Sequence, residues 1–222
     1  MLALARQGAT EGFWLRAERQ MSGRGRHGRD WSSPIGNCYV STLVRIRPTD
    51  PPAATLALVA AIGLAETVEV YRPADGVTPP VRIKWPNDLL IDGAKLSGIL
   101  LERADDAVVI GIGVNLAHHP DLPDRATTSL AAQGITVDAA SFVETLADSI
   151  TRWVSRWRGE GLAAVRQRWV RAAHPVGTAL TVRLPDATIE GLFDGLDADG
   201  ALLLRLADGS RRVIHAGDVF LL

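Results

Sequence analysis

Residues 23–31, with the sequence GRGRHGRDW, carry the side chains best suited to bind an anion. Glycines alternate with Arg24, Arg26 and Arg29, and Trp31 closes the run. Glycine lets the backbone approach a ligand closely, and the planar guanidinium group matches phosphate and carboxylate oxygens. We therefore interpret residues 23–31 as a mobile loop that closes over an anion. Taken alone, the run fits a solvated basic loop or a segment that contacts RNA equally well.

Two further runs place charged groups next to turns. Lys84 and Asp88 flank a Trp-Pro bend in the run KWPND, and Lys95 follows an Asp-Gly turn signal at residues 92–93. A lysine just past such a turn can reach into a pocket beside the sheet and stabilise negative charge there. The alternative for Lys95 is a solvated hairpin residue.

Glycines and asparagines form the remaining candidate pocket wall. Gly98 would let a ligand approach the strand backbone, although such a glycine also marks a bulge. The run GIGVN, residues 111–115, ends in Asn115, and its glycines could admit a flat ligand such as adenine or could mark close strand packing. Asn87 and Asn115 are expected to be polar walls of the pocket.

Composition excludes several classes of protein. The chain has 222 residues, enough for a large core, with 24 basic and 25 acidic residues, so we expect no chain-wide nucleic-acid surface. Cys38 is the single cysteine and cannot form an internal disulfide, which suits the cytoplasm. We expect it to be a buried, inert thiol. No signal peptide or membrane span is recognised, and the adjacent pair His118 and His119 lacks the accompanying ligands of a metal site.

These residues must be positioned by a mixed set of strands and helices. The patterns predict the end of a helix at residues 1–7, a meander of strands and three longer helices. Asp138 is the expected cap of the second long helix. The predicted strands are 13–20, 37–46, 81–84, 89–91, 95–102 and 107–115, and the predicted helices are 51–70, 137–157 and 161–173.

The pattern becomes all-β beyond Pro175, which we take as a domain boundary. Five short strands are predicted at residues 181–184, 188–194, 201–206, 211–215 and 219–222. So many short strands joined by tight turns suggest a small barrel. We therefore predict one domain over residues 1–174 and a second over residues 175–222.

In this order, the arginine–glycine run, KWPND, the run KLSGILLE at residues 95–102 and GIGVN resemble the biotin–protein ligases. The resemblance covers about residue 13 to the C-terminus. It implies an α+β fold, with a mixed, mainly antiparallel sheet packed by helices, like the class II synthetases, followed by a small SH3-like β-barrel. It also implies a cytoplasmic ligase that uses ATP and Mg²⁺ to convert biotin into biotinyl-5'-AMP. The enzyme then transfers biotin to a lysine of a carboxylase carrier domain.

The resemblance also implies roles for individual residues. Arg24, Gly25 and Arg26 would lie against biotin and its phosphate, Gln20 would contact the biotin ring, and Lys95 would contact both groups. Arg29 ranks lower because it could pack on Trp31, which we expect mainly to anchor the end of the loop. The expected catalytic residues are Lys95, Arg26 and Asp88. The expected biotin and adenylate site consists of Gln20, Gly23, Arg24, Gly25, Arg26, Lys95 and Gly98. The weaker expectations, on the nucleotide side, are Trp31, Lys84, Asn87 and Asn115.

Asp88 has three candidate roles within such a reaction. It could orient and deprotonate the attacking lysine, whose reference pKa of about 10.4 keeps the amine mostly protonated at neutral pH. It could instead contact Mg²⁺, or simply cap the turn. No metal site made by side chains is expected.

The chain departs from the family pattern at its start. The family usually has a Ser-Thr-Asn run before the first helix that contributes to the biotin pocket, and no such run follows Met1. We expect the true start to lie upstream; otherwise the biotin pocket is incomplete. The DNA-binding domain of the repressor members is also absent, so no operator binding is expected. The sequence leaves homodimer formation open.

Two rival functions remain at this point. A lipoate–protein ligase shares the general architecture, but residues 23–31 and KWPND favour biotin. A non-catalytic protein that binds RNA or a nucleotide would use the arginine–glycine run and the barrel. Balanced charge and the scarcity of aromatic clusters count against that reading.

Overall fold

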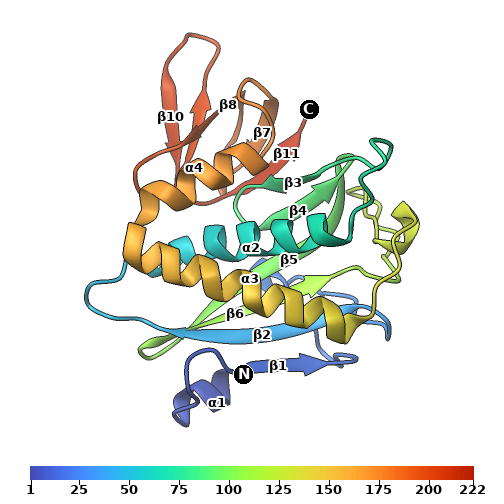
Figure 1. Ribbon diagram of the computed structural model, residues 1–222. Helices are drawn as coiled ribbons and strands as arrows, with labels where there is room; N and C mark the ends of the chain where they lie inside the picture. Colours follow the sequence, from blue (N-terminus) through green and yellow to red (C-terminus); the bar gives the residue numbers. More distant parts are fainter.

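A computed structural model describes residues 1–222 as two antiparallel sheets with helices on one side of the larger sheet (Figure 1). The larger sheet has six strands in the order β1-β2-β6-β5-β4-β3. Its strands are β1 (Trp14–Ala17), β2 (Cys38–Arg45), β3 (Val81–Lys84), β4 (Asp88–Ile91), β5 (Ala94–Ala104) and β6 (Ala107–Val114). The predicted α+β fold with a mainly antiparallel sheet is confirmed.

Three helices pack together on one face of this sheet (Figure 1). They are α2 (Leu56–Tyr71), which follows the short helix η2 (Ala53–Thr55), then α3 (Ala139–Glu160) and α4 (Leu162–Ala172). Residues 53–71 are long and apolar enough to cross a membrane by length and composition, yet 67% of that apolar window is buried. The helix α2 packs against the sheet on one side and against α3 on the other. A helix that is covered in this way is apolar on all sides, which explains its composition.

Polar groups fix the ends and the contacts of these helices. Asp138 caps α3 as predicted, because its carboxylate accepts a hydrogen bond from the Ser141 amide at 2.9 Å. The indole N–H of Trp157 donates to the Thr55 hydroxyl at 2.8 Å and joins α3 to η2. The layer of helices is therefore held by directional bonds as well as by apolar burial.

The first helix and the first strand are shorter in the structure than the sequence predicted. The helix α1 (Leu2–Arg6) packs near the β5–β6 turn, where Ala5 contacts a small cluster with Ala104 and Ala107. The expected strand 13–20 contains only β1, because pairing with β2 ends at the pair Ala17 and Tyr39. The rest of that expected strand leads into the arginine–glycine run.

The second sheet contains all five predicted C-terminal strands. Their order is β10-β9-β8-β7-β11, with β7 (Ala179–Arg183), β8 (Thr188–Leu196), β9 (Leu202–Arg205), β10 (Arg211–Ile214) and β11 (Asp218–Leu221). No pairing joins β10 to β11, so the strands form an open sheet and the predicted barrel closure is not found. Arg166 of α4 donates to the Leu196 carbonyl at 2.8 Å and ties this sheet to the helices.

Candidate active site

A cavity of about 990 Å³ lies between the arginine–glycine loop (residues 23–31), the larger sheet and the second sheet. Every residue that the sequence singled out as a candidate site residue lines it. These residues are Gln20, Gly23, Arg24, Gly25, Arg26, Trp31, Lys84, Asn87, Asp88, Lys95, Gly98 and Asn115. The cavity is therefore the candidate active site, although its contents are not fixed by geometry alone.

Strand register places the central residues on one face of the sheet. Directly paired residues are Lys84 with Asp88, Asp88 with Gly98, and Gly98 with Gly113. Antiparallel partners point to the same face, so these residues form one row across β3, β4, β5 and β6. The alternate residue Ile112 faces the helices, so the row lies on the opposite face of the sheet.

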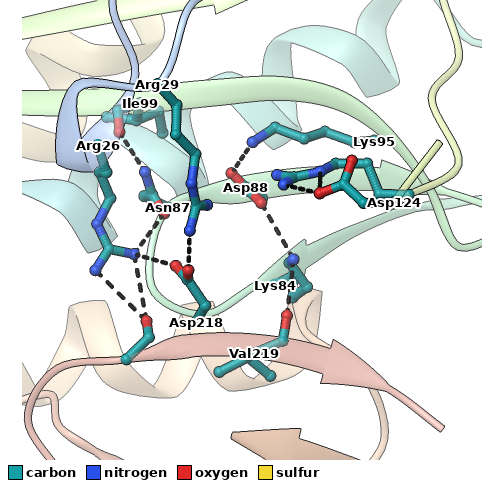
Figure 2. Close-up of polar contacts among 12 residues, drawn as sticks. Arg26, Arg29, Lys84, Asn87, Asp88, Lys95, Ile99, Asp124, Asp218 and Val219 are labelled. Atoms are coloured by element: carbon teal, nitrogen blue, oxygen red, sulfur yellow. Dashed lines mark hydrogen bonds and ion pairs between the residues drawn. The ribbon is translucent and has the colours of Figure 1, made fainter. Parts of the chain in front are cut away.

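Asp88 stands between two lysines at the centre of the row (Figure 2). One carboxylate oxygen accepts from Lys95 Nζ at 2.6 Å, and the other lies 3.2 Å from Lys84 Nζ. The Asp88 side chain is only 10% exposed. Burial works to raise its pKa, but the two ammonium groups outweigh burial and hold the pKa of Asp88 below its ordinary value. Asp88 is therefore a buried, charged counter-ion.

Lys95 has fewer compensating partners than Asp88. Burial lowers the pKa of Lys95, and its pairing with the single carboxylate of Asp88 only partly opposes this. The backbone on both sides is fixed, since Lys95 donates to the Ala126 carbonyl and accepts from the Thr128 amide, both at 2.9 Å. The loop after β6 thus holds Lys95 in place from beyond the sheet.

The arginine–glycine loop folds back on itself across the cavity. The Gly25 amide donates to the Arg29 carbonyl at 2.7 Å, and the Trp31 amide donates to the Gly23 carbonyl at 3.0 Å. At its tip, the short helix η1 (Arg26–Gly28) contains His27 with a φ of 56°. The loop predicted to cover an anion therefore has a defined hairpin shape in this structure.

The three arginines of the loop differ in their contacts. Arg24 is 64% exposed and lies 3.8 Å from Glu102. Arg26 and Arg29 turn toward the second sheet, where both approach Asp218 (Figure 2). Arg29 forms a close ion pair with that carboxylate, while Arg26 Nη1 lies 3.9 Å from it and also 3.4 Å from Asn87 Oδ1. Although burial opposes it, this pairing holds the pKa of Asp218 low.

Trp31 occupies the space that Gly98 of β5 and Gly113 of β6 leave open. A Cβ added to Gly113 would lie 2.6 Å from the Trp31 ring, and one added to Gly98 would lie 3.2 Å from it. The ammonium of Lys95 lies 5.6 Å from the ring centroid, so Lys95 rather than Arg29 is the cation over Trp31. We expected these glycines to admit a flat ligand or close packing; in this structure the flat group above Gly113 is Trp31.

The remaining polar residues of the site have clear partners. Gln20 accepts from the Ser33 hydroxyl at 2.9 Å, next to the end of the arginine–glycine loop. Asn87 donates to the Ile99 carbonyl at 2.5 Å, which fixes the KWPND bend against β5. Asn115 is buried and donates to the Thr128 carbonyl at 3.0 Å, so it fastens the loop after β6.

Asp218 and Arg125 are charged residues of the cavity that the sequence analysis did not single out. Asp218 enters from β11, and Arg125 from the loop after β6. Neither lies in a run with unusual composition, so only the fold brings them to the site. The second sheet also contributes the Val219 carbonyl, which accepts from Lys84 Nζ at 3.0 Å (Figure 2).

The other candidates for reactive chemistry are accounted for elsewhere. Burial raises the pKa of the Cys38 thiol to about 12, which confirms a buried cysteine that stays protonated. His119 Nδ1 lies 3.1 Å from the Ser129 hydroxyl, and the His118 amide donates to Asn37. No group of three or more His, Cys, Asp or Glu side chains could hold a metal ion. The Arg and Lys side chains of the cavity are the groups whose chemistry suits contact with an anion.

Two family models match this chain. The model described as "Biotin/lipoate A/B protein ligase family" matches residues 7–115, and "Biotin protein ligase C terminal domain" matches residues 177–222. The first match contains the arginine–glycine loop and the row across the sheet, while the second contains Asp218 and Val219. The two sheets that line the cavity therefore fall within matched segments, whereas its lining residues between positions 120 and 127 lie outside them.

Individual proteins show the same similarity. A biotin–[acetyl-CoA-carboxylase] ligase of Paracoccus denitrificans is 39% identical over 226 residues, covering 96% of this chain and 92% of the relative. A biotin protein ligase from Aquifex aeolicus, solved with biotin and ATP, shares the fold with a TM-score of 0.85 at 24% identity, covering 99% and 94% of the two chains. A ligase from Leishmania major, solved with biotinyl-5-AMP, has a TM-score of 0.65 at 26% identity and covers 97% and 94%.

Proposed function

Because this chain belongs to the biotin/lipoate A/B protein ligase family, we propose that it is a biotin–protein ligase. It joins biotin to ATP, which gives biotinyl-5'-AMP and pyrophosphate, and then transfers biotin to a lysine of a carboxylase carrier domain, with release of AMP. The observation that carries this proposal is the similarity to the Paracoccus denitrificans ligase over nearly the whole of both chains. The charges of the cavity suit this reaction.

In the first step, two anions must come together. The biotin carboxylate attacks the α-phosphate of ATP, so negative charge accumulates where the two groups meet. Lys95 Nζ and Arg26 supply positive charge at the cavity, and each charge-assisted hydrogen bond contributes about 1.5–3 kcal/mol. We assign Lys95 the stabilisation of the reacting phosphate, and Arg24 and Arg26 the retention of the adenylate. Gln20 and Gly98 line the biotin side.

Asp88 is best assigned the orientation of Lys95. Its two oxygens are already engaged by Lys95 and Lys84, and its low pKa makes it a weak proton acceptor. Deprotonation of the incoming carrier lysine by Asp88 is therefore the less favoured of its candidate roles. Lys84 and Asn87 hold the KWPND bend, so they support the nucleotide side indirectly.

Magnesium enters as part of the nucleotide substrate in this proposal. The side chains do not form a metal site, since Asp88 and Asp218 are both engaged by cations and no cluster of potential ligands exists. Mg²⁺ commonly keeps several waters and binds substrate phosphates with few protein ligands. No step of the mechanism is assigned to a metal held by this chain.

The partners follow from the reaction. Biotin, ATP and the carrier domain of a biotin-dependent carboxylase, acetyl-CoA carboxylase by analogy with the Paracoccus relative, are the expected substrates. We place the enzyme in the cytoplasm, which suits a chain whose single cysteine can form no internal disulfide. The lipoate ligase is less favoured because the relative that matches nearly the whole chain is named as a biotin ligase. The RNA-binding alternative is less favoured because Arg26 and Arg29 both approach the Asp218 carboxylate.

Biotin-dependent exchange of labelled pyrophosphate into ATP tests the proposal directly. We expect exchange with biotin and none with lipoate, followed by transfer to a carrier domain in a second assay. Exchange with lipoate alone would favour the lipoate ligase, and retention of RNA without any exchange would favour the binding protein.

A further inference from the structure

Arg125 makes few hydrogen bonds for an arginine that lines the cavity. Its side chain is 26% exposed, but its only hydrogen bonds go to Asp124, the residue before it in the chain. By contrast, Arg45 bonds the carbonyls of Ala5 and Ala9, and Arg158 bonds Glu11 and Asp50. Those arginines join distant segments, whereas Arg125 joins none. The hydrogen bonds of Arg125 therefore tie no distant segment to the cavity.

The position of Arg125 is nevertheless well defined. It lines the active cavity and directly precedes the short stretch of backbone that pairs with Lys95. The hydrogen bonds from Lys95 to Ala126 and from Thr128 to Lys95 hold that stretch beside the reacting lysine. Asp124 and its ion pair lie beside the Lys95–Asp88 pair in Figure 2. The loop thus presents a guanidinium group at a fixed place next to Lys95.

The guanidinium keeps donors free for a ligand. Asp124 accepts from Nε and Nη2 of Arg125, so the Nη1 hydrogens have no protein partner. Asp124 itself is 56% exposed, and such a pair contributes little to stability. Arginine with a free edge in a cavity suits the bidentate recognition of phosphate.

Arg125 is also a candidate for phosphates that the other cations of the cavity do not engage. The adenylate carries one phosphate, which Lys95 and the arginine–glycine loop can engage, but ATP brings two more phosphates that must be bound and then released. Arg125 belongs neither to that loop nor to the row across the sheet. Resting on the proposed ligase activity, we propose that Arg125 binds the β- and γ-phosphates of ATP and the pyrophosphate that leaves.

The test compares Arg125→Ala and Arg125→Lys with wild type in both directions of the first step. We expect Arg125→Ala to raise KM for ATP, and KM for pyrophosphate in the reverse reaction, by about tenfold or more, which is the loss of one charge-assisted contact. Arg125→Lys, which keeps the charge but loses the planar fork, should recover part of this. The affinities for biotin and biotinyl-5'-AMP should stay unchanged.

Arg103→Ala is the matched control, because Arg103 also bonds only a nearby residue, Asp105, and lies outside the cavity. It should leave all constants at the wild-type values. An unchanged KM for pyrophosphate in Arg125→Ala, or a matching loss of biotin affinity, would overturn the assignment. Calorimetry of ATP and pyrophosphate binding to the same variants gives a measurement that does not depend on activity. Absence of exchange in wild type would count against the ligase activity. Equal pyrophosphate affinity of wild type and Arg125→Ala would count against the role of Arg125.

Discussion

At the scale of single residues, the site depends on an unequal sharing of charge. Asp88 has two ammonium partners, and Lys95 has one carboxylate partner. Burial therefore dominates at Lys95 and lowers its pKa, while the two lysines dominate at Asp88. The Asp88 carboxylate favours the charged form of Lys95 against the burial that opposes it, so Asp88 controls the lysine that we assign to the reaction.

Asp88→Asn should change the pH dependence of pyrophosphate exchange. Without Asp88, burial lowers the pKa of Lys95 further, so its ammonium loses the proton at a lower pH than in wild type. The alkaline limb of the exchange rate should move to lower pH, and activity should recover partly as the medium becomes more acidic. Exchange rates between pH 6 and about 10 measure this. Asp92→Asn, on the exposed turn of the same hairpin, is the control; the same alkaline limb in both variants would contradict the argument.

At the scale of elements, β6 and the arginine–glycine loop fit together through one aromatic ring. Trp31 lies over Gly113 so closely that no side chain fits between them. The ring also lies under the Lys95 ammonium, so the strand positions both the end of the loop and the environment of the lysine. A glycine in a strand is otherwise unfavourable, and close approach by another group is a recognised reason for it.

Gly113→Ala should therefore damage the site, whereas Gly111→Ala should not. The new methyl group at residue 113 would meet the Trp31 ring at 2.6 Å, and overpacking of this kind costs about 1–3 kcal/mol. At residue 111 the nearest atom is 3.6 Å away, an ordinary contact. We expect a lower melting temperature, altered tryptophan fluorescence and weaker adenylate retention for Gly113→Ala only. Equal behaviour of the two variants would show that Trp31 does not depend on Gly113.

The strands and helices could be predicted from the sequence as far as local patterns of residues determine them. Alternation and turn signals found the strands, and helical spacing found α3, because burial on one face leaves a periodic trace in the sequence. The helix α2 is buried on all sides and was recognised instead by its apolar composition and the prolines before it. The strand predicted at 13–20 was too long, since its length depends on where β2 stops pairing. The place of Trp31 above Gly113 could not be predicted either, because it needs the register of β5 and β6 and the path of the loop.

At the scale of the whole molecule, the two sheets share one cavity. Asp218 of β11 engages Arg26 and Arg29, and the Val219 carbonyl engages Lys84. Contacts between residues about 190 positions apart carry no local signal, so the sequence predicted the strands of the second sheet but not which edge would face the site. The division into residues 1–174 and 175–222 stays a prediction.

Asp218→Asn should loosen the arginine–glycine loop in the absence of ligand. The exposed ion pair with Arg29 is worth about 0.2–1 kcal/mol, so loss of the charge should speed loop opening by up to about fivefold. The measurement is the rate of trypsin cleavage within residues 23–31. Trypsin must bind an arginine side chain in its own pocket, so it cuts this loop only when the loop is open. Asp208→Asn, in the β9–β10 turn, is the control. Equal cleavage rates for the two variants would mean that Asp218 does not hold the loop.

The connection at residues 173–178 passes between two groups of strands that each supply part of one ligand-binding wall. A peptide bond cut there would leave one fragment with Lys95 and the arginines and another with Asp218 and the Val219 carbonyl. Neither fragment contains a whole wall. We expect ligation to return only when the fragments recombine, so turnover by the cut protein would report the association of its halves.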